Sequence, residues 1–157
     1  EKNADVVKLA SYAPLFNRIG HSQWKPDMIW FDDSAVYLTP NYYVQKLFAN
    51  HRGSHTVLLH DQDVELRKKG IYVSVAMDED ENIIVKAVNT THESFELSLE
   101  DTDGVAVNTA GKQWTLQGTG EMPGGLPEKS AVTEQEIQID GCVMLPERSM
   151  VVVVYRQ

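Results

Sequence analysis

From Ile71 onward, apolar residues recur at every second position, and this period constrains the fold more than any other feature of the sequence. The segment "IYVSVAM" places Ile71, Val73, Val75 and Met77 on one face of an extended chain. A period of two is typical of strands with one buried face. Similar runs follow in "IIVKAVN", "FELSLE", "QWTLQ", "TEQEIQI" and "MVVVVYR". Short strands divided by turn-like spacers predict a mainly β chain, folded as an antiparallel, jelly-roll-like β-sandwich.

Details of these runs refine the prediction. The strict alternation in "FELSLE" directs Phe95, Leu97 and Leu99 inward, and the run from Met150 to Tyr155 is apolar on both faces, which predicts a central strand. The polar spacer "DEDEN" suits a hairpin connection. The spacer "GTGEMPGG" (Gly118 to Gly125) lacks the Lys-Ser/Thr pair of a phosphate-binding loop, so we interpret it as a flexible connection.

A short helix is predicted within "TPNYYVQKLFANHRG" (Thr39 to Gly53). Thr39 is a suitable N-cap residue, Pro40 suits the first helical position, and Gly53 can adopt the left-handed conformation that ends a helix. One apolar stripe runs along this helix, at Tyr43, Val44, Leu47 and Phe48. Because the periodicity changes after the helix, we place a domain boundary near Gly53 and Ser54.

The chain before the helix is harder to interpret. "ADVVKLASYAPLF" (Ala4 to Phe16) fits either one face of a helix or a buried parallel strand, and Pro14 ends either element. The segment from Gly20 to Leu38 is long, aromatic and irregular. A loop of this length is usually functional or contains structure of its own.

Composition excludes several classes of partner. The net charge of −9 argues against binding to nucleic acid or to an anionic membrane, which would both repel the chain. No apolar run approaches the roughly 20 residues of a membrane span. Cys142 is the only cysteine, so an internal disulfide is excluded, and we interpret it as a small buried side chain. The sequence does not begin with Met, and we expect it to be a piece of a longer protein.

No residue pattern forms a recognisable catalytic or metal site, and we expect no cofactor. Asp32 and Asp33 would point to opposite faces of an extended strand, so they cannot both line one pocket. The acidic run from Asp78 to Glu81 fits a solvated turn, with weak calcium binding as the alternative. His51 and His55 have the four-residue spacing of a zinc site, but the expected helix ends between them.

Two further patterns have ordinary explanations. "NTT" at Asn89 fits a glycosylation acceptor, although a hydrogen bond within a turn explains the triplet equally simply. A nucleophile elbow of the form Gly-x-Ser-x-Gly does not occur in the sequence.

Three segments in order, "VVKLASYAPLF", "QWKPDMIWFD" and "TPNYYVQKLF", closely resemble the α-L-arabinofuranosidases of glycoside hydrolase family 51. They span about the first third of the chain. The β-rich remainder is similar to the C-terminal sandwich of those enzymes through "VKAVNTT" and "LPERSMVVVVY". The resemblance implies a (β/α)₈ barrel followed by a sandwich. Residues 1–53 would then be the last barrel strand (Val6 to Tyr12), its loop (Ala13 to Leu38) and the last barrel helix, packed on the barrel wall, and residues 54–157 the sandwich.

The resemblance also implies retaining hydrolysis of terminal arabinofuranosyl groups of plant polysaccharides by two glutamates. In such barrels the acid/base glutamate directly follows an asparagine, and no Asn-Glu pair occurs in the sequence. No catalytic residue is therefore assigned, and we expect this piece to be inactive. Arabinose-containing polysaccharides and oligosaccharides are the expected partners of the full enzyme.

If the strand prediction holds, Tyr12, Asn17 and Trp24 lie near the face where such barrels bind substrate. Trp24 would stack on a sugar ring, and Tyr12 or Asn17 would donate or accept hydrogen bonds. The alternative is that Trp24 and Trp30 only fill the interior of the long loop.

Two other functions remain open at this stage. A free-standing carbohydrate-binding module would need an exposed aromatic platform, for which Trp114 is the main candidate. An interaction domain would expose an apolar patch where the barrel had packed, and such a patch would make the chain prone to form homo-oligomers.

Overall fold

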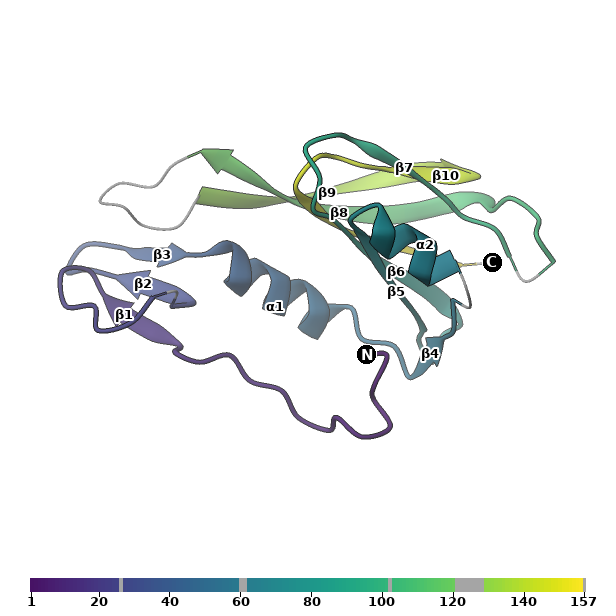
Figure 1. Ribbon diagram of the computed structural model, residues 1–157. Helices are drawn as coiled ribbons and strands as arrows, with labels where there is room; N and C mark the ends of the chain where they lie inside the picture. Colours follow the sequence, from purple (N-terminus) through teal and green to yellow (C-terminus); the bar gives the residue numbers. More distant parts are fainter. Residues whose placement is uncertain (26, 60–61, 102, 121–128, 157) are drawn as a thin grey trace.

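A six-stranded antiparallel sheet forms the largest part of the chain (Figure 1). The structure is a computed structural model, and it describes the whole chain except residues 26, 60–61, 102, 121–128 and 157. The strands lie in the order β4-β5-β6-β11-β8-β9. Their bounds are β4 (His55–Val57), β5 (Ile71–Met77), β6 (Asn82–Asn89), β8 (Asn108–Gly120), β9 (Lys129–Asp140) and β11 (Ser149–Arg156).

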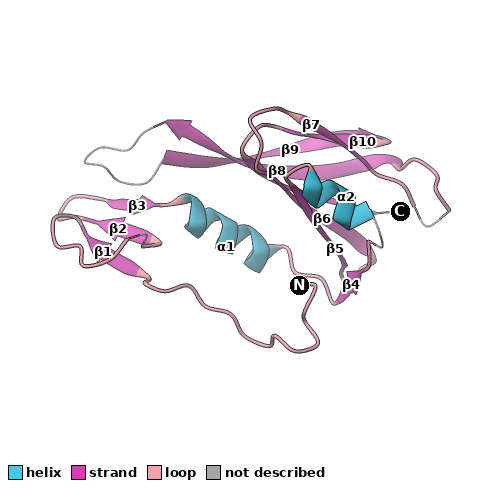
Figure 2. Cartoon of the chain, in the orientation of Figure 1, coloured by secondary structure: helices cyan, strands magenta, loops and turns pink. Residues whose placement is uncertain are grey.

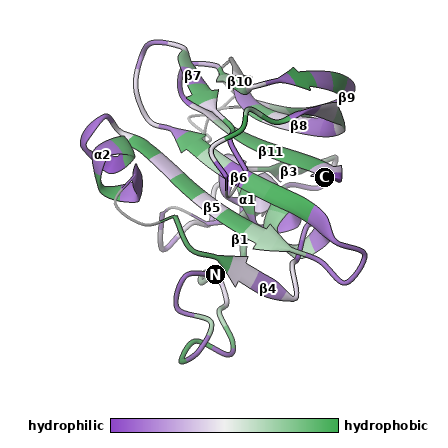
Figure 3. Cartoon of the chain, turned by 90° about the vertical axis from the view of Figure 1, so that its right-hand side faces the viewer, coloured by the Kyte–Doolittle hydropathy of each residue, from purple (hydrophilic) through white to green (hydrophobic). Residues whose placement is uncertain are grey.

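The closing strand β11 lies at the centre of this sheet, between β6 and β8, as its apolar sequence predicted. Val151, Val152 and Val153 are each at most 1% exposed. Alternate residues of the strand contribute to two separate cores, because neighbouring side chains point to opposite faces. Figure 3 shows β11 coloured as hydrophobic over much of its length. The sheet must therefore be covered on both sides.

One face is covered by a second, two-stranded sheet of β7 (Phe95–Ser98) and β10 (Cys142–Leu145), and by α2 (Gln62–Lys68). Leu97 and Leu99 are buried as the alternation predicted, while Phe95 is only half-buried at the edge of the core. The antiparallel β-sandwich is thus confirmed. Cys142 was expected to be buried, but it is half-exposed in β10.

The opposite face of the six-stranded sheet is covered by α1 (Pro40–Asn50), which lies across it in Figures 1 and 2. The predicted stripe of α1 packs on residues of β6, β8 and β11, with Leu47 only 4% exposed. The sequence-based expectation that this stripe packs on a barrel wall is therefore wrong for this chain. The apolar outer face of β11 is the surface that the stripe covers.

The ends of α1 differ partly from the prediction. Pro40 occupies the first turn, but the hydroxyl of Thr39 donates to the carbonyl of Met28 at 2.8 Å instead of capping the helix. The helix ends at His51, whose backbone N–H donates to Leu47, and not at a left-handed Gly53. Gly53 is needed for a different reason. A Cβ atom there would lie 2.5 Å from the Cβ of Ala76 in β5.

The segment before α1 contains three short strands, β1 (Phe16–Arg18), β2 (Ile29–Phe31) and β3 (Val36–Leu38), which form a separate sheet. They lie within the stretch expected to be a loop. Residues 6–12, expected to be a strand, are not in a strand, and Val6 and Leu9 are 73% and 89% exposed. The physical reason is that a strand needs a neighbour to satisfy its backbone N–H and C=O groups, and no strand among the described residues pairs with this segment.

Two turns agree with their predictions. The "DEDEN" spacer joins β5 to β6 as a hairpin, and the carboxylate of Asp78 accepts from the backbone N–H groups of Asp80 and Asn82. The side-chain oxygen of Asn89 accepts from the backbone N–H and the hydroxyl of Thr91, at 2.9 and 2.8 Å. The turn interpretation of the "NTT" triplet is therefore correct. Most of the "GTGEMPGG" spacer lies outside the described residues.

The two helices of the described residues are short: α1 spans 11 residues and α2 spans 7. Over the described part of the chain, no helix has the length and apolar character required to cross a bilayer.

The packing of α1 yields a first testable prediction. We expect Leu47→Ala to lower the free energy of unfolding by about 2–5 kcal/mol, because it opens a cavity between α1 and the central strand. Gln45→Ala, at an exposed position of the same helix, is the matched control and should change stability by less than about 0.5 kcal/mol. Urea unfolding of both variants measures the difference. Equal free energies of unfolding for the two variants would show that the Leu47 contact does not stabilise the packing of α1.

Candidate functional site

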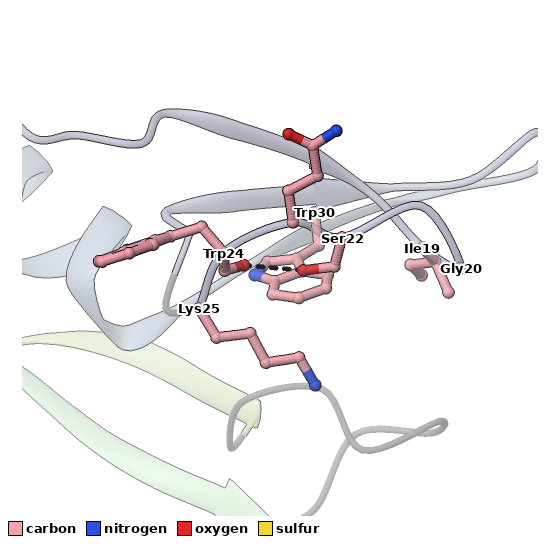
Figure 4. A pocket seen from close by; sticks show the side chains of 7 residues that line it. Ile19, Gly20, Ser22, Trp24, Lys25 and Trp30 are labelled. Atoms are coloured by element: carbon pink, nitrogen blue, oxygen red, sulfur yellow. Dashed lines mark hydrogen bonds between the residues drawn. The ribbon is translucent and has the colours of Figure 1, made fainter.

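The candidate site is an open pocket in the connection between β1 and β2 (Figure 4). Its volume is about 440 Å³. The residues that line it include two aromatic, one cationic and several polar side chains. They are Ile19, Gly20, Ser22, Gln23, Trp24, Lys25 and Trp30.

The two tryptophans of this pocket have different environments. Trp30 lies in β2 and is 3% exposed, and its indole N–H donates to the carbonyl of Asp27 at 3.0 Å. Trp24 is 64% exposed, and its ring projects away from that of Trp30 in Figure 4. The Nζ atom of Lys25 lies 5.7 Å from the centroid of the Trp30 ring. Trp30 thus fills the interior, while Trp24 is available to a ligand.

Asn17 holds the loop that forms the pocket. It is buried in β1, and its amide nitrogen lies 2.7 Å from Ser22 Oγ and 2.6 Å from Asp27 Oδ2. It also lies 3.4 Å from the carbonyl oxygen of Trp24, which in turn accepts from the hydroxyl of Ser22 at 2.7 Å. The amide nitrogen of Asn17 is therefore occupied within the protein, and the geometry makes Asn17 a positioning residue for Trp24.

Tyr12 is not among the residues that line the pocket. Its hydroxyl accepts a hydrogen bond from the side-chain amide of Asn41 at 2.9 Å, in the first turn of α1. Of the residues predicted to contact substrate, the structure brings Asn17 and Trp24 together and places Tyr12 elsewhere. Gln23 and Lys25 line the pocket but were not predicted as site residues, although both lie within "QWKPDMIWFD".

The neighbouring acidic residues are held in a turn. Asp32 Oδ1 accepts from the hydroxyl and backbone N–H of Ser34, each at 2.7 Å, and from the backbone N–H of Ala35 at 2.9 Å. These bonds, led by that of the Ser34 hydroxyl, lower the pKa of Asp32, and its charge raises the pKa of Tyr37. Asp33 instead pairs with Arg18 at 2.6 Å. An ionised carboxylate that accepts this many bonds is a poor general acid.

His51 and Trp114 also have structural roles. His51 Nδ1 lies 2.8 Å from the carbonyl oxygen of Leu47, and its ring centroid is 4.2 Å from that of Trp114. The indole N–H of Trp114 donates to Glu134 at 2.9 Å. Among the described residues, no group of His, Cys, Asp or Glu side chains is arranged to hold a metal ion.

Comparison with known proteins gives one consistent result. The family model described as "Alpha-L-arabinofuranosidase C-terminal domain" matches residues 1–145. Alpha-L-arabinofuranosidase 1 of Arabidopsis thaliana is 33% identical over 160 residues, which cover 95% of this chain and 23% of that protein. An extracellular exo-alpha-L-arabinofuranosidase of Streptomyces chartreusis is 54% identical over 57 residues, or 36% of this chain and 7% of that protein. The chain thus spans less than a quarter of the length of these curated relatives.

Solved structures agree on the fold. The chain superposes on the arabinose-bound MgGH51 α-L-arabinofuranosidase with a TM-score of 0.77 and 21% identity, covering 98% of this chain and 25% of that one. For the arabinose complex of the Thermotoga maritima α-L-arabinofuranosidase, the TM-score is 0.67 at 15% identity, with 99% and 35% coverage.

The turn at Asp32 predicts a measurable pH dependence. Its pKa in the folded chain is lowered from the usual 3.8, so its stabilising effect is complete above about pH 3.8 and is lost as the pH falls through the lower folded value. We expect an NMR titration of the Asp32 carboxyl to have its midpoint below 3.8. In Ser34→Ala, which removes the strongest of these bonds, the midpoint should rise. A wild-type midpoint at or above 3.8 would contradict the described geometry.

Proposed function

The chain belongs to the family of alpha-L-arabinofuranosidase C-terminal domains, and from this premise we propose that it is the C-terminal part of a retaining α-L-arabinofuranosidase of glycoside hydrolase family 51. The whole enzyme would hydrolyse terminal arabinofuranosyl groups of plant polysaccharides. The observation that carries this proposal is the family match over residues 1–145, joined by the similarity to named arabinofuranosidases over 95% of the chain.

We propose that this piece alone has no hydrolase activity. Retention requires a nucleophilic carboxylate and an acid/base carboxyl about 5–5.5 Å apart, on either side of the scissile bond. No Asn-Glu pair marks an acid/base residue in the sequence. Asp32 and Asp78, which stood out as candidates in the sequence, accept hydrogen bonds within their own turns. Both catalytic glutamates would therefore lie in the part of the enzyme that precedes this chain.

The role of this piece would be to support the catalytic barrel. In this proposal, residues 1–53 supply the last strand, loop and helix of the (β/α)₈ barrel, and residues 54–157 form the sandwich domain. The position of α1 supports the idea, because its apolar stripe is buried on the six-stranded sheet. A helix that closes one domain while packing on the next fixes the two relative to each other.

An activity assay tests the proposed inactivity. We expect the purified chain to release no arabinose from an aryl α-L-arabinofuranoside, since the nucleophile and the acid/base residue are both missing. An intact family 51 arabinofuranosidase at the same molar concentration is the positive control. Release above the buffer blank, proportional to protein concentration, would overturn the proposal.

For substrate contact we propose Trp24, with Asn17 as the residue that positions it and Tyr12 as a polar group farther along the same segment. The exposed ring of Trp24 and the hydrogen bonds that fix its backbone favour a role in stacking on a sugar ring. Asn17 would act by positioning Trp24, and Tyr12 would take part once the residues before α1 pack against the barrel.

We expect Trp24→Ala in the full enzyme to raise KM for an arabinoside roughly two- to tenfold, if stacking on a sugar contributes as much as the about 0.5–1.5 kcal/mol of an aromatic pair. The matched control is Tyr72→Ala, which removes an exposed aromatic ring from β5 of the sandwich and should leave KM unchanged. Steady-state kinetics on one substrate measure both. Unchanged KM and turnover in Trp24→Ala would exclude Trp24 from the site.

The alternative of a free-standing carbohydrate-binding module depended on Trp114 as an aromatic platform. The structure places this ring against His51, with its indole N–H bonded to Glu134. A sugar would have to displace these contacts in order to stack on the ring. No other observation favours the module, so the enzyme fragment remains our proposal.

We also propose that the isolated chain self-associates. Val6, Val7, Leu9 and Phe16 are each more than half exposed in the segment that would face the barrel, and exposed apolar groups of this kind promote association. Sedimentation velocity over a wide range of concentrations should show a rise in weight-average mass. A monomer at every concentration would contradict the proposal.

A further inference from the structure

Lys86 is a cation in the interior of the protein. It lies in the middle of β6, on the face covered by α1, and its side chain is 1% exposed. Its partners across the sheet are Ser74 of β5 and Val152 of β11. Lysine is almost never found at such depth without a charged partner, because removing an ammonium group from water costs several kcal/mol.

The partner of Lys86 is the side chain of Glu1. One carboxylate oxygen forms an ion pair with Lys86 Nζ, and the other accepts a hydrogen bond from the hydroxyl of Ser74 at 2.6 Å. Lys86 Nζ also lies 4.7 Å from the ring centroid of Phe48 in α1. The carboxylate therefore meets one charged and one neutral donor, both projecting from the sheet, and the Phe48 ring also attracts the cation.

No other carboxylate takes part in an ion pair with Lys86 among the described residues. The attraction of the Phe48 ring compensates only part of the cost of desolvating the ammonium group. Removing the Glu1 carboxylate would thus leave a buried positive charge without a counter-ion, which is far more unfavourable than losing an exposed ion pair.

The first residues of the chain have few other reasons to lie on the sheet. Lys2 pairs with Asp63 of α2 at 2.6 Å, and Thr56 donates a hydrogen bond of 3.4 Å to the carbonyl of Glu1. The apolar residues that follow, Val6 and Leu9, remain exposed and add little hydrophobic stabilisation. Polar contacts, and not burial of apolar surface, must hold this segment against the sheet.

We propose that Lys86 and Ser74 form a carboxylate-binding site, here called the Lys86 site, and that its occupation by Glu1 fixes the N-terminal segment to the sandwich. The site selects a carboxylate because two oxygens are needed, one beside the ammonium group and one beside the hydroxyl. This inference rests on contacts within the chain and holds whether or not the proposed enzymatic function is correct.

Substitution of Glu1 is the first test. Glu1→Gln keeps the size of the side chain and removes its charge. We expect about tenfold or faster trypsin cleavage after the exposed Lys8, together with a lower thermal midpoint. Glu79→Gln, an identical change at an exposed position of the β5–β6 turn, is the matched control and should alter neither. Unchanged cleavage and midpoint in Glu1→Gln would overturn the proposal.

A second test separates a carboxylate site from a general effect on folding. In Glu1→Ala, sodium acetate should slow cleavage after Lys8 or restore the thermal midpoint relative to sodium chloride at equal ionic strength, because acetate can enter the vacated site. Adding Lys86→Met should abolish this response and restore stability, since the buried charge is then gone. If acetate and chloride act alike, or if Lys86→Met fails to relieve the loss caused by Glu1→Ala, Lys86 does not form such a site.

Discussion

The fold depends on one constraint: a central strand whose two faces are both apolar must be covered on both sides. In β11, Val151 and Val153 contribute to the core beneath the small sheet and α2, while Met150 and Val152 contribute to the core beneath α1. Full burial of one such side chain stabilises the fold by about 1.5–3 kcal/mol relative to leaving it in water. The second sheet satisfies one face only, so the position of α1 follows from the sequence of β11 as much as from its own stripe.

This arrangement connects the sandwich to the candidate pocket. The helix begins directly after β3, and Thr39 bonds to Met28, next to β2, which carries the buried Trp30. Within the small sheet, Asn17 sets the course of the loop that presents Trp24. The exposed ring of Trp24 is therefore connected to the centre of the large sheet through a short series of contacts that includes Asn17, Thr39 and α1.

The sequence was most informative where local pattern and tertiary environment agree. The alternation in "IYVSVAM" predicted β5 at its observed bounds, and the two-sided apolar run predicted the central strand. It was least informative where a role depends on distant partners. Residues 6–12 have the composition of a strand but no strand beside them, and Gly53 matters through its contact with Ala76 and not through its backbone angles. For the site, the sequence pointed to Trp24 and Asn17, but the amide nitrogen of Asn17 is occupied by distant partners such as Asp27, which no local pattern indicates.

The close contact between Gly53 and β5 limits how α1 can move. The Gly53 backbone runs so close to Ala76 of β5 that no side chain fits between them, and a few residues earlier Leu47 is buried in the core on the same face of the sheet. Because Leu47 holds the helix itself and Gly53 holds the connection that follows it, α1 cannot swing about its C-terminal end as a tethered helix would.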